Sequence, residues 1–189
     1  MKRSLGYIAS AMLLLWAAVS AADPYTDTVN LFKNAGASSK FFNNSYGYAV
    51  FPTIAKGALL VGGAHGQGRV FRQGQWVGDT SMTQVSVGFQ AGGEAYSMII
   101  FFEDKRAFDE FTQGNFEFGA DAKVVAITAA AGAGTSTEGS SATASGGKKD
   151  AITEGAYYKG MAVFTIVKGG AMAAAAVAGQ KFSFTPRKS

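Results

Sequence analysis

The stretch GYAVFPTIAKG, residues 47–57, decides the fold because the chain contains it twice. Residues 160–169 read GMAVFTIVKG, and once Pro52 is set aside, eight of the ten paired positions are identical. Both copies are rich in β-branched and aromatic residues and are bounded by glycines, a pattern typical of buried strands. A proline cannot donate a hydrogen bond to a strand ladder, so Pro52 predicts a bulge or an edge position in the first copy.

The two copies start about a hundred residues apart, which is longer than the roughly 20–50 residue period of repeat arrays. We therefore expect them to be symmetry-related strands of one curled sheet. The simplest interpretation is that both are core strands and nothing more. The functional alternative brings the closing lysines, Lys56 and Lys168, to one rim, where they bind an anion together with Arg69 and Lys181, two basic residues that follow the copies at matching distances.

The first residues predict a secretory signal peptide over residues 1–21. Lys2 and Arg3 precede an apolar run from Leu5 to Val19, and small residues follow at the expected cleavage site. The apolar run is shorter than the ~20 residues of a membrane-spanning helix, and an uncleaved anchor is the alternative. We expect a periplasmic or secreted protein without a transmembrane helix after cleavage.

The chain has no cysteine, so an exported form would fold without disulfides, which favours a bacterial envelope over a disulfide-stapled secreted scaffold. The absence of cysteine also excludes a lipoprotein anchor, so any contact with a membrane must be made by the folded surface. Removal of the leader lowers the formal net charge from +4 to +2. Such a small charge does not predict nucleic-acid binding.

Two short helices are predicted. Asp23 and Pro24 form a helix start, and Tyr25, Val29 and Phe32 follow at helical spacing up to Gly36. This helix lacks the Lys/Arg excess of an interfacial helix, so we expect it to pack on the sheet. The second helix is expected over residues 105–111, with Asp104 as its cap.

The rest of the chain predicts many short strands with glycines at their bends. The fold class is therefore mainly antiparallel β with short helices, a single curled sheet that is barrel-like or sandwich-like. Alternation places Val85 on the buried face of a strand over residues 82–91, and residues 116–126 read as another amphipathic strand. The predicted organisation is a helical segment over residues 22–46 and a β-rich domain over 47–185, with a flexible loop at 129–150.

Catalysis and a cofactor are not expected. His65 is the only histidine, which argues against a histidine-based triad or metal site. The glycine-rich segment after the first copy matches no nucleotide-binding motif. A hydrolase remains an alternative through Glu94 with Glu103 or Asp104, although strand ends often carry such carboxylates.

Several motifs together resemble the SYLF domain family: GYAVFP at 47–52, KG at 56–57, glycines over 62–68, Trp76, VGFQAGGE at 87–94 and FGADA at 118–122. The resemblance covers about residues 47–184 and implies a lipid-binding domain, whose partner is a phospholipid or an anionic membrane surface. The alternative is a structural module that contacts other envelope proteins. Yeast members regulate actin, but an exported protein would not meet cytoplasmic actin, so that partner is not expected.

The binding free energy that the basic residues would contribute to lipid binding can be estimated. Each basic residue near an anionic membrane contributes about 1 kcal/mol, so Lys56, Arg69, Lys168 and Lys181 together contribute about 4 kcal/mol. Micromolar binding needs about 8 kcal/mol. We therefore expect an apolar contribution as well, from an inserted side chain or from a lipid tail in a groove.

Overall fold

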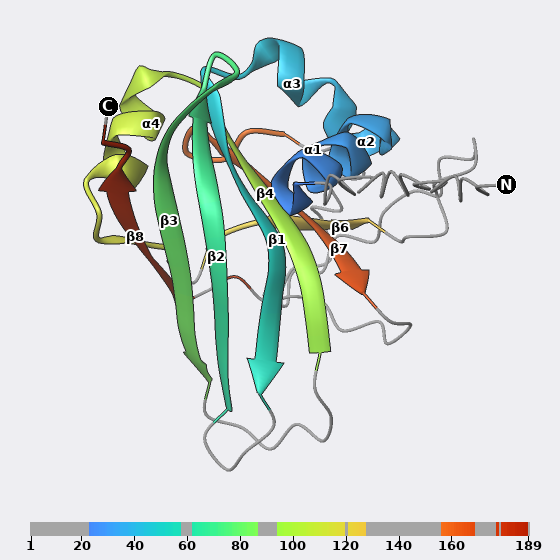
Figure 1. The fold of residues 1–189 in the computed structure, drawn as a ribbon, viewed down its shortest axis with the longest axis vertical. Coiled ribbons are helices and arrows are strands. Elements are labelled where there is room, and N and C mark those ends of the chain that lie inside the picture. The colour runs from blue at the N-terminus through green and yellow to red at the C-terminus, as the bar shows by residue number, and fades with distance from the viewer. Residues whose placement is uncertain are drawn as a thin grey trace, which may run out of the picture.

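The computed structural model describes residues 23–57, 62–86, 94–119, 121–127, 156–168, 177 and 179–188. These residues form one eight-stranded sheet in the order β5-β8-β3-β2-β1-β4-β7-β6. Every neighbouring pair is antiparallel except β6 and β7, which are parallel. The sheet curls, with β8 and β7 turning back behind the long central strands (Figure 1). The predicted fold class is confirmed.

The four central strands are the longest, and short elements surround them. The strands are β1 (Gly47–Gly57), β2 (Gly62–Arg72), β3 (Gln75–Ser86), β4 (Glu94–Phe102), β5 (Phe116–Glu117), β6 (Val124–Ile127), β7 (Met161–Lys168) and β8 (Gln180–Pro186). The helices are α1 (Pro24–Asn34), α2 (Gly36–Ser39), α3 (Phe41–Asn44) and α4 (Lys105–Thr112).

The two copies of the repeated motif are β1 and β7, which lie on either side of β4 and run parallel to each other. Val50 and Phe164 both pair with Ile99 of β4, so the copies are one residue out of register. A one-residue offset moves a side chain to the other face of a sheet. As a result Phe51 and its counterpart Phe164 lie in different hydrophobic clusters, one on each face.

Pro52 lies at a bulge. The pairing of β1 with β2 shifts between Val50 and Thr53, and its pairing with β4 shifts at the same place. Since β1 has a partner on both sides, the bulge is confirmed and the edge position is not.

The inner face of the curled sheet holds the larger cluster, and α4 packs on it. Phe51, Phe102, Phe111 and Phe182 are almost fully buried there. As predicted, the Asp104 carboxylate caps α4, accepting a 2.8 Å hydrogen bond from the Ala107 amide. The close packing requires glycine on β2: a Cβ at position 68 would lie 2.6 Å from two ring carbons of Phe51.

The outer face is covered by α1, α2 and α3 over part of its area, beside β1 and β4 (Figure 1). Phe41 contacts the rings of Phe101 and Phe164, with centroid distances of 5.5 and 5.0 Å. The predicted helix start is confirmed, but α1 ends at Asn34, before Gly36. The single turns α2 and α3 were not predicted. The Ser38 hydroxyl of α2 donates to the Phe32 carbonyl of α1 at 2.6 Å, which helps to fix the bend between α1 and α2.

Two strand predictions were wrong. Val85 is 76% exposed, whereas Met82 is fully buried. Pairing of Met82 with Phe182 places the even-numbered positions of β3 inside, and this register overrides the local alternation. The stretch 116–126 is not one strand either: β5 and β6 lie at opposite edges of the sheet, and the residues between them cross from one edge to the other.

Several predictions concern residues outside the described ranges: the signal peptide over 1–21, the flexible loop at 129–150, and part of the motif at 87–94. Among the residues that are described, no helix has the length and apolar character needed to cross a membrane.

Candidate functional site

Lys56 and Lys168 lie at the same end of the sheet. In the ladders on either side of β4, Lys56 pairs with Glu94 and Lys168 with Ala95. The backbones of β1 and β7 are therefore about 10 Å apart at this end, two strand spacings. The two lysines pair with consecutive residues of β4. The Lys168 ammonium donates to the Thr53 hydroxyl at 2.9 Å on the outer face.

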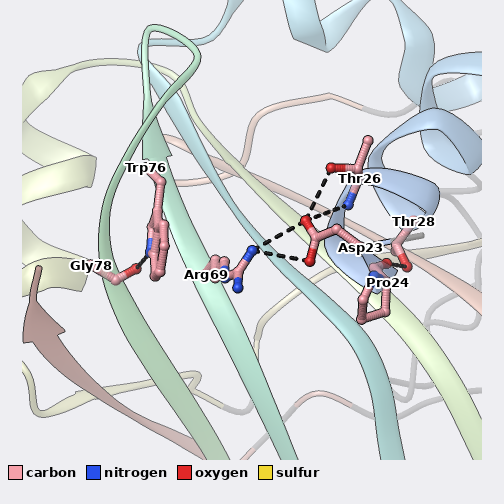
Figure 2. A network of polar contacts seen from close by, with 7 residues as sticks. All are labelled: Asp23, Pro24, Thr26, Thr28, Arg69, Trp76 and Gly78. Atoms are coloured by element: carbon pink, nitrogen blue, oxygen red, sulfur yellow. Dashed lines mark hydrogen bonds and ion pairs between the residues drawn. The ribbon is translucent and has the colours of Figure 1, made fainter. Parts of the chain in front are cut away.

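Arg69 lies elsewhere and has partners within the fold. Its guanidinium donates to both carboxylate oxygens of Asp23 at 3.1 and 3.2 Å (Figure 2). The same group lies 4.0 Å from the ring centroid of Tyr25 and 4.2 Å from that of Trp76. Arg69 thus attaches the start of α1 to β2 and β3.

Lys181 lies on β8, towards the opposite edge of the sheet, and forms an ion pair of 3.7 Å with Glu117. The structure therefore brings Lys56 and Lys168 to one end of the sheet but separates Arg69 and Lys181 from them.

A cavity of about 180 Å³ lies where the two edges of the curled sheet approach each other. We name it the seam pocket. Its apolar lining comes from Phe116, Phe118, Ala122, Met161 and Val163, and its polar lining from Glu110, Glu117, Asp121, Lys123, Tyr158 and Lys159. Both β5 and β7 contribute, so the pocket exists only because the sheet curls.

Asp121 is the centre of the polar rim. It accepts hydrogen bonds from the Lys159 ammonium at 2.5 Å and from the Tyr158 hydroxyl at 2.8 Å. These two donors lower the pKa of the Asp121 carboxyl to about 2, the lysine having the larger effect. The carboxylate therefore stays charged at any physiological pH and keeps Lys159 in place.

The turn that carries Tyr158 and Lys159 has an uncommon backbone. Lys159 has a φ of 52° and Gly160 a φ of 79°, while Tyr158 and Met161 form an isolated bridge that closes the turn. A non-glycine residue in the left-handed region costs of order 1 kcal/mol or more, and such strain clusters at binding sites. The turn places Lys159 and Tyr158 directly before β7, at the mouth of the pocket.

Lys123 differs from the other charged residues of the rim. Glu110 pairs with Arg106 at 3.4 Å, and Glu117 with Lys181. The Lys123 ammonium lies 5.1 Å from the Tyr158 ring centroid, and no carboxylate of the described residues pairs with it. Lys123 is thus a rim cation available to an anion.

Sequence reasoning missed the seam pocket, because the pocket depends on a contact between the two edges of the sheet. The alternation over 116–126 did place Phe116 and Phe118 on one side and Lys123 on the other. That pattern predicted an amphipathic segment, but it did not predict that the chain leaves one edge of the sheet after β5 and joins the opposite edge at β6.

Among the described residues, no group of three or more histidine, aspartate or glutamate side chains is placed so that it could hold a metal ion. His65 is exposed on β2, and its Nε2 lies 3.0 Å from the Gln67 amide nitrogen. Asp104, one of the carboxylates of the hydrolase alternative, is used as the cap of α4.

Comparison with known proteins adds two findings. Residues 83–188 match the model of the Ysc84 family, described as "Las17-binding protein actin regulator". Over 159 residues the chain is 28% identical to Beta cell expansion factor A of Aeromonas veronii, an alignment that covers 83% of this chain and 52% of that protein. The chain thus spans about half the length of the curated relative it matches.

The family match covers the second part of the sheet, whereas β1, β2 and most of β3 lie before residue 83. The matched residues include β4, β7 and β8 and all of the described residues that line the seam pocket. Because the match covers more than half of the chain, the protein belongs to the Ysc84 family, and the predicted resemblance to SYLF domains is confirmed.

Proposed function

We propose that the protein binds an acidic lipid, with a short part of an acyl chain in the seam pocket and the anionic group of the lipid at Lys123. The observation that carries this proposal is the combination of apolar walls with a rim cation that no described carboxylate neutralises. The SYLF resemblance, which implies lipid binding, supports the same class of ligand.

The size of the pocket sets the expected affinity. A cavity of 150 Å³ in another protein accommodates benzene, so 180 Å³ holds about six carbon atoms. Burial of six methylene groups at about 0.8 kcal/mol each contributes about 5 kcal/mol. One lysine near an anionic surface adds about 1 kcal/mol. A total near 6 kcal/mol corresponds to a dissociation constant of tens of micromolar.

The pocket is too small for a whole lipid, since sites for drug-sized ligands span about 300–1,000 Å³. The remainder of the lipid would stay in the bilayer or on the protein surface. We therefore expect weak and reversible membrane association, and the electrostatic part of it should decrease with added salt.

Two measurements test the proposal. Native mass spectrometry of the purified protein should show a co-purifying lipid, and the protein should co-sediment with phosphatidylglycerol vesicles more than with phosphatidylcholine vesicles. Ala122→Trp, which fills the pocket, and Lys123→Glu, which reverses the rim charge, should each reduce co-sedimentation at least fivefold.

The matched control is Lys40→Glu, an equal change of charge on an exposed residue outside the pocket. It should bind vesicles within twofold of the unsubstituted protein. Equal binding by all four proteins, with circular dichroism spectra that show an intact fold, would contradict the proposed site.

The second candidate is a protein-interaction module, which the printed description of the family favours because it names a protein partner. This function would not require the seam pocket. Retention of a purified partner by the Ala122→Trp variant, together with the absence of lipid in native mass spectra, would select it.

The bacterial envelope is the proposed location of either activity, and the leader-like sequence over residues 1–21 supports it. Expression in a bacterium followed by fractionation should place the protein in the periplasm or the medium. N-terminal sequencing should then find a start close to residue 22. Recovery of the full-length chain in the cytoplasm would contradict this location.

A further inference from the structure

The outer face of the sheet carries a continuous row of residues that crosses six strands. Consecutive ladder pairs connect its members: Thr83 with Lys181, His65 with Thr83, Ala55 with His65, Ala55 with Ala95, and Ala95 with Lys168. We name it the lysine row. All its members are exposed except Ala95, which is half-buried. Five strand spacings separate the two lysines, about 24 Å along the sheet.

A second row lies beside the lysine row and consists of hydroxyl and amide side chains. It contains Ser183, Ser81, Gln67 and Thr53, joined by consecutive ladder pairs. We name it the hydroxyl row. Its groups contact one another and the lysine row: the two serine hydroxyls lie 2.6 Å apart, Gln67 lies 3.0 Å from His65, and Lys168 donates to Thr53.

The two lysines stand at the two ends of the lysine row, and none of the residues between them is charged at neutral pH except for the titratable His65. Beyond Lys181 the same ladder continues onto β5 with Glu117, which forms a 3.7 Å ion pair with Lys181 and partly offsets the charge at that end. The middle of the surface is neutral and presents many hydrogen-bond donors and acceptors.

We propose that an acidic polysaccharide chain binds across this surface, with carboxylates of the chain at Lys168 and Lys181 and sugar hydroxyls on the side chains between them. Hydroxyl, amide and imidazole groups can both donate and accept, as sugar hydroxyls require. The spacing of the lysines matches a ligand with several repeating units, because a single small anion cannot span about 24 Å.

Other partners fit the surface less well. A bound polypeptide is usually anchored by apolar or aromatic side chains in pockets. The cavity at the Lys181 end of the two rows is lined mainly by polar residues, among them Ser81, Thr83, Lys181 and Ser183. A bilayer is nearly flat on this scale, whereas this face is the convex side of the curl and its two ends bend away from a plane. Nucleic acid binding relies on many phosphate contacts, and two lysines supply few.

This surface is separate from the seam pocket. The apolar residues that line the pocket, including Phe118 and Val163, belong to the inner cluster, whereas both rows lie on the outer face. Among the described residues, the two surfaces meet only at Glu117, which lines the pocket and pairs with Lys181, whereas Lys168 and Lys123 each belong to one surface alone. Loss of binding at Lys168 and loss of binding at Lys123 should therefore be independent of each other.

Alginate oligomers, which are polymers of uronic acids, and neutral dextran are suitable probes. Isothermal titration calorimetry at low salt should detect binding of alginate oligomers but not of dextran. The double variant Lys168→Gln/Lys181→Gln should weaken the affinity at least fivefold. Ser81→Glu, which places a carboxylate in the middle of the surface, should weaken it by a similar factor.

The matched control is Lys33→Gln/Lys40→Gln, which removes two exposed charges from the helices. It should bind alginate within twofold of the unsubstituted protein. The proposal would be overturned if the control lost affinity to the same extent or if the protein did not bind alginate at all. It would also be overturned if Lys168 and Lys181 were needed for binding to vesicles and not for binding to alginate. All four substituted positions of the test and control doubles are exposed, so thermal unfolding should confirm that each variant is folded.

Discussion

Asp23 and Arg69 are 46 residues apart in the sequence and are joined by two hydrogen bonds of 3.1 and 3.2 Å (Figure 2). The same carboxylate caps α1 by accepting a hydrogen bond from the Thr26 amide. One side chain thus starts a helix and attaches it to the sheet.

Asp23→Ala should remove both functions of this carboxylate. The loss of an N-cap costs about 0.5–2 kcal/mol, and we expect a decrease of about 1–2 kcal/mol in the free energy of unfolding measured in urea. Asp27→Ala is the control, because Asp27 is an exposed acidic residue in the same first turn without a capping role. It should cost at most about 0.5 kcal/mol. Equal losses in the two variants would contradict a special role of Asp23.

Gly68→Ala should destabilise the inner core. The added methyl group would lie 2.6 Å from the Phe51 ring and 2.9 Å from the Thr80 methyl group, so both must move. Overpacking of this kind costs about 1–3 kcal/mol. Gly36→Ala is the control, because no atom lies within 4 Å of its added methyl group and the residue is helical. Urea unfolding should find this control neutral or slightly stabilised.

The Asp121 carboxyl should titrate with a pKa of about 2, which carbon-detected NMR can follow. The pKa is lowered on folding, so the stabilising contribution is present above the ordinary value near 3.8 and is lost as the pH falls towards 2. Lys159→Gln should raise the pKa towards its ordinary value, because the lysine is the principal cause of the shift. Lys33→Gln should leave it unchanged, and a similar effect of both variants would rule out the local hydrogen bond as the cause.

Tyr96 should make the protein sensitive to alkaline pH. Burial on the inner face raises the pKa of its hydroxyl, and the hydrogen bond from Gln180 at 2.9 Å opposes this only in part. The unfolded chain therefore loses the proton first, so stability is complete below about pH 10 and decreases above it. The slope contributed by one such group reaches about 1.4 kcal/mol per pH unit.

Tyr96→Phe should accordingly flatten the decline of the free energy of unfolding between pH 10 and higher values. The two proteins should show parallel curves between pH 7 and 9, where the hydroxyl stays protonated in both states. Parallel curves above pH 10 as well would show that other groups cause the alkaline loss.

Much of the fold follows from local patterns. The paired motif over residues 47–57 and 160–169 predicted two strands of one sheet, and Asp23 and Asp104 predicted both helix caps. In each case the strand or helix cap is determined by residues within a few positions of it, so it could be predicted from the sequence.

The candidate site was less predictable because it depends on register and partners. β4 separates the two copies and offsets them by one residue, which no local pattern indicates. Arg69 was expected to be free for an anion, but a carboxylate 46 residues earlier occupies it. The seam pocket requires β5 and β7 to meet across a curled sheet, and that contact is a property of the whole fold.

Equivalent residues of the two motif copies lie on opposite faces of the sheet, and this matters for protein engineering. Substitutions are often transferred between the repeats of a duplicated protein on the assumption that equivalent positions have equivalent neighbours. Here Phe51 and Phe164 occupy equivalent places in the motif, yet Phe51 packs in the cluster on the inner face of the sheet and Phe164 packs in the cluster beneath the helices on the outer face. Consensus averaging of the two copies would therefore mix the requirements of two different cores.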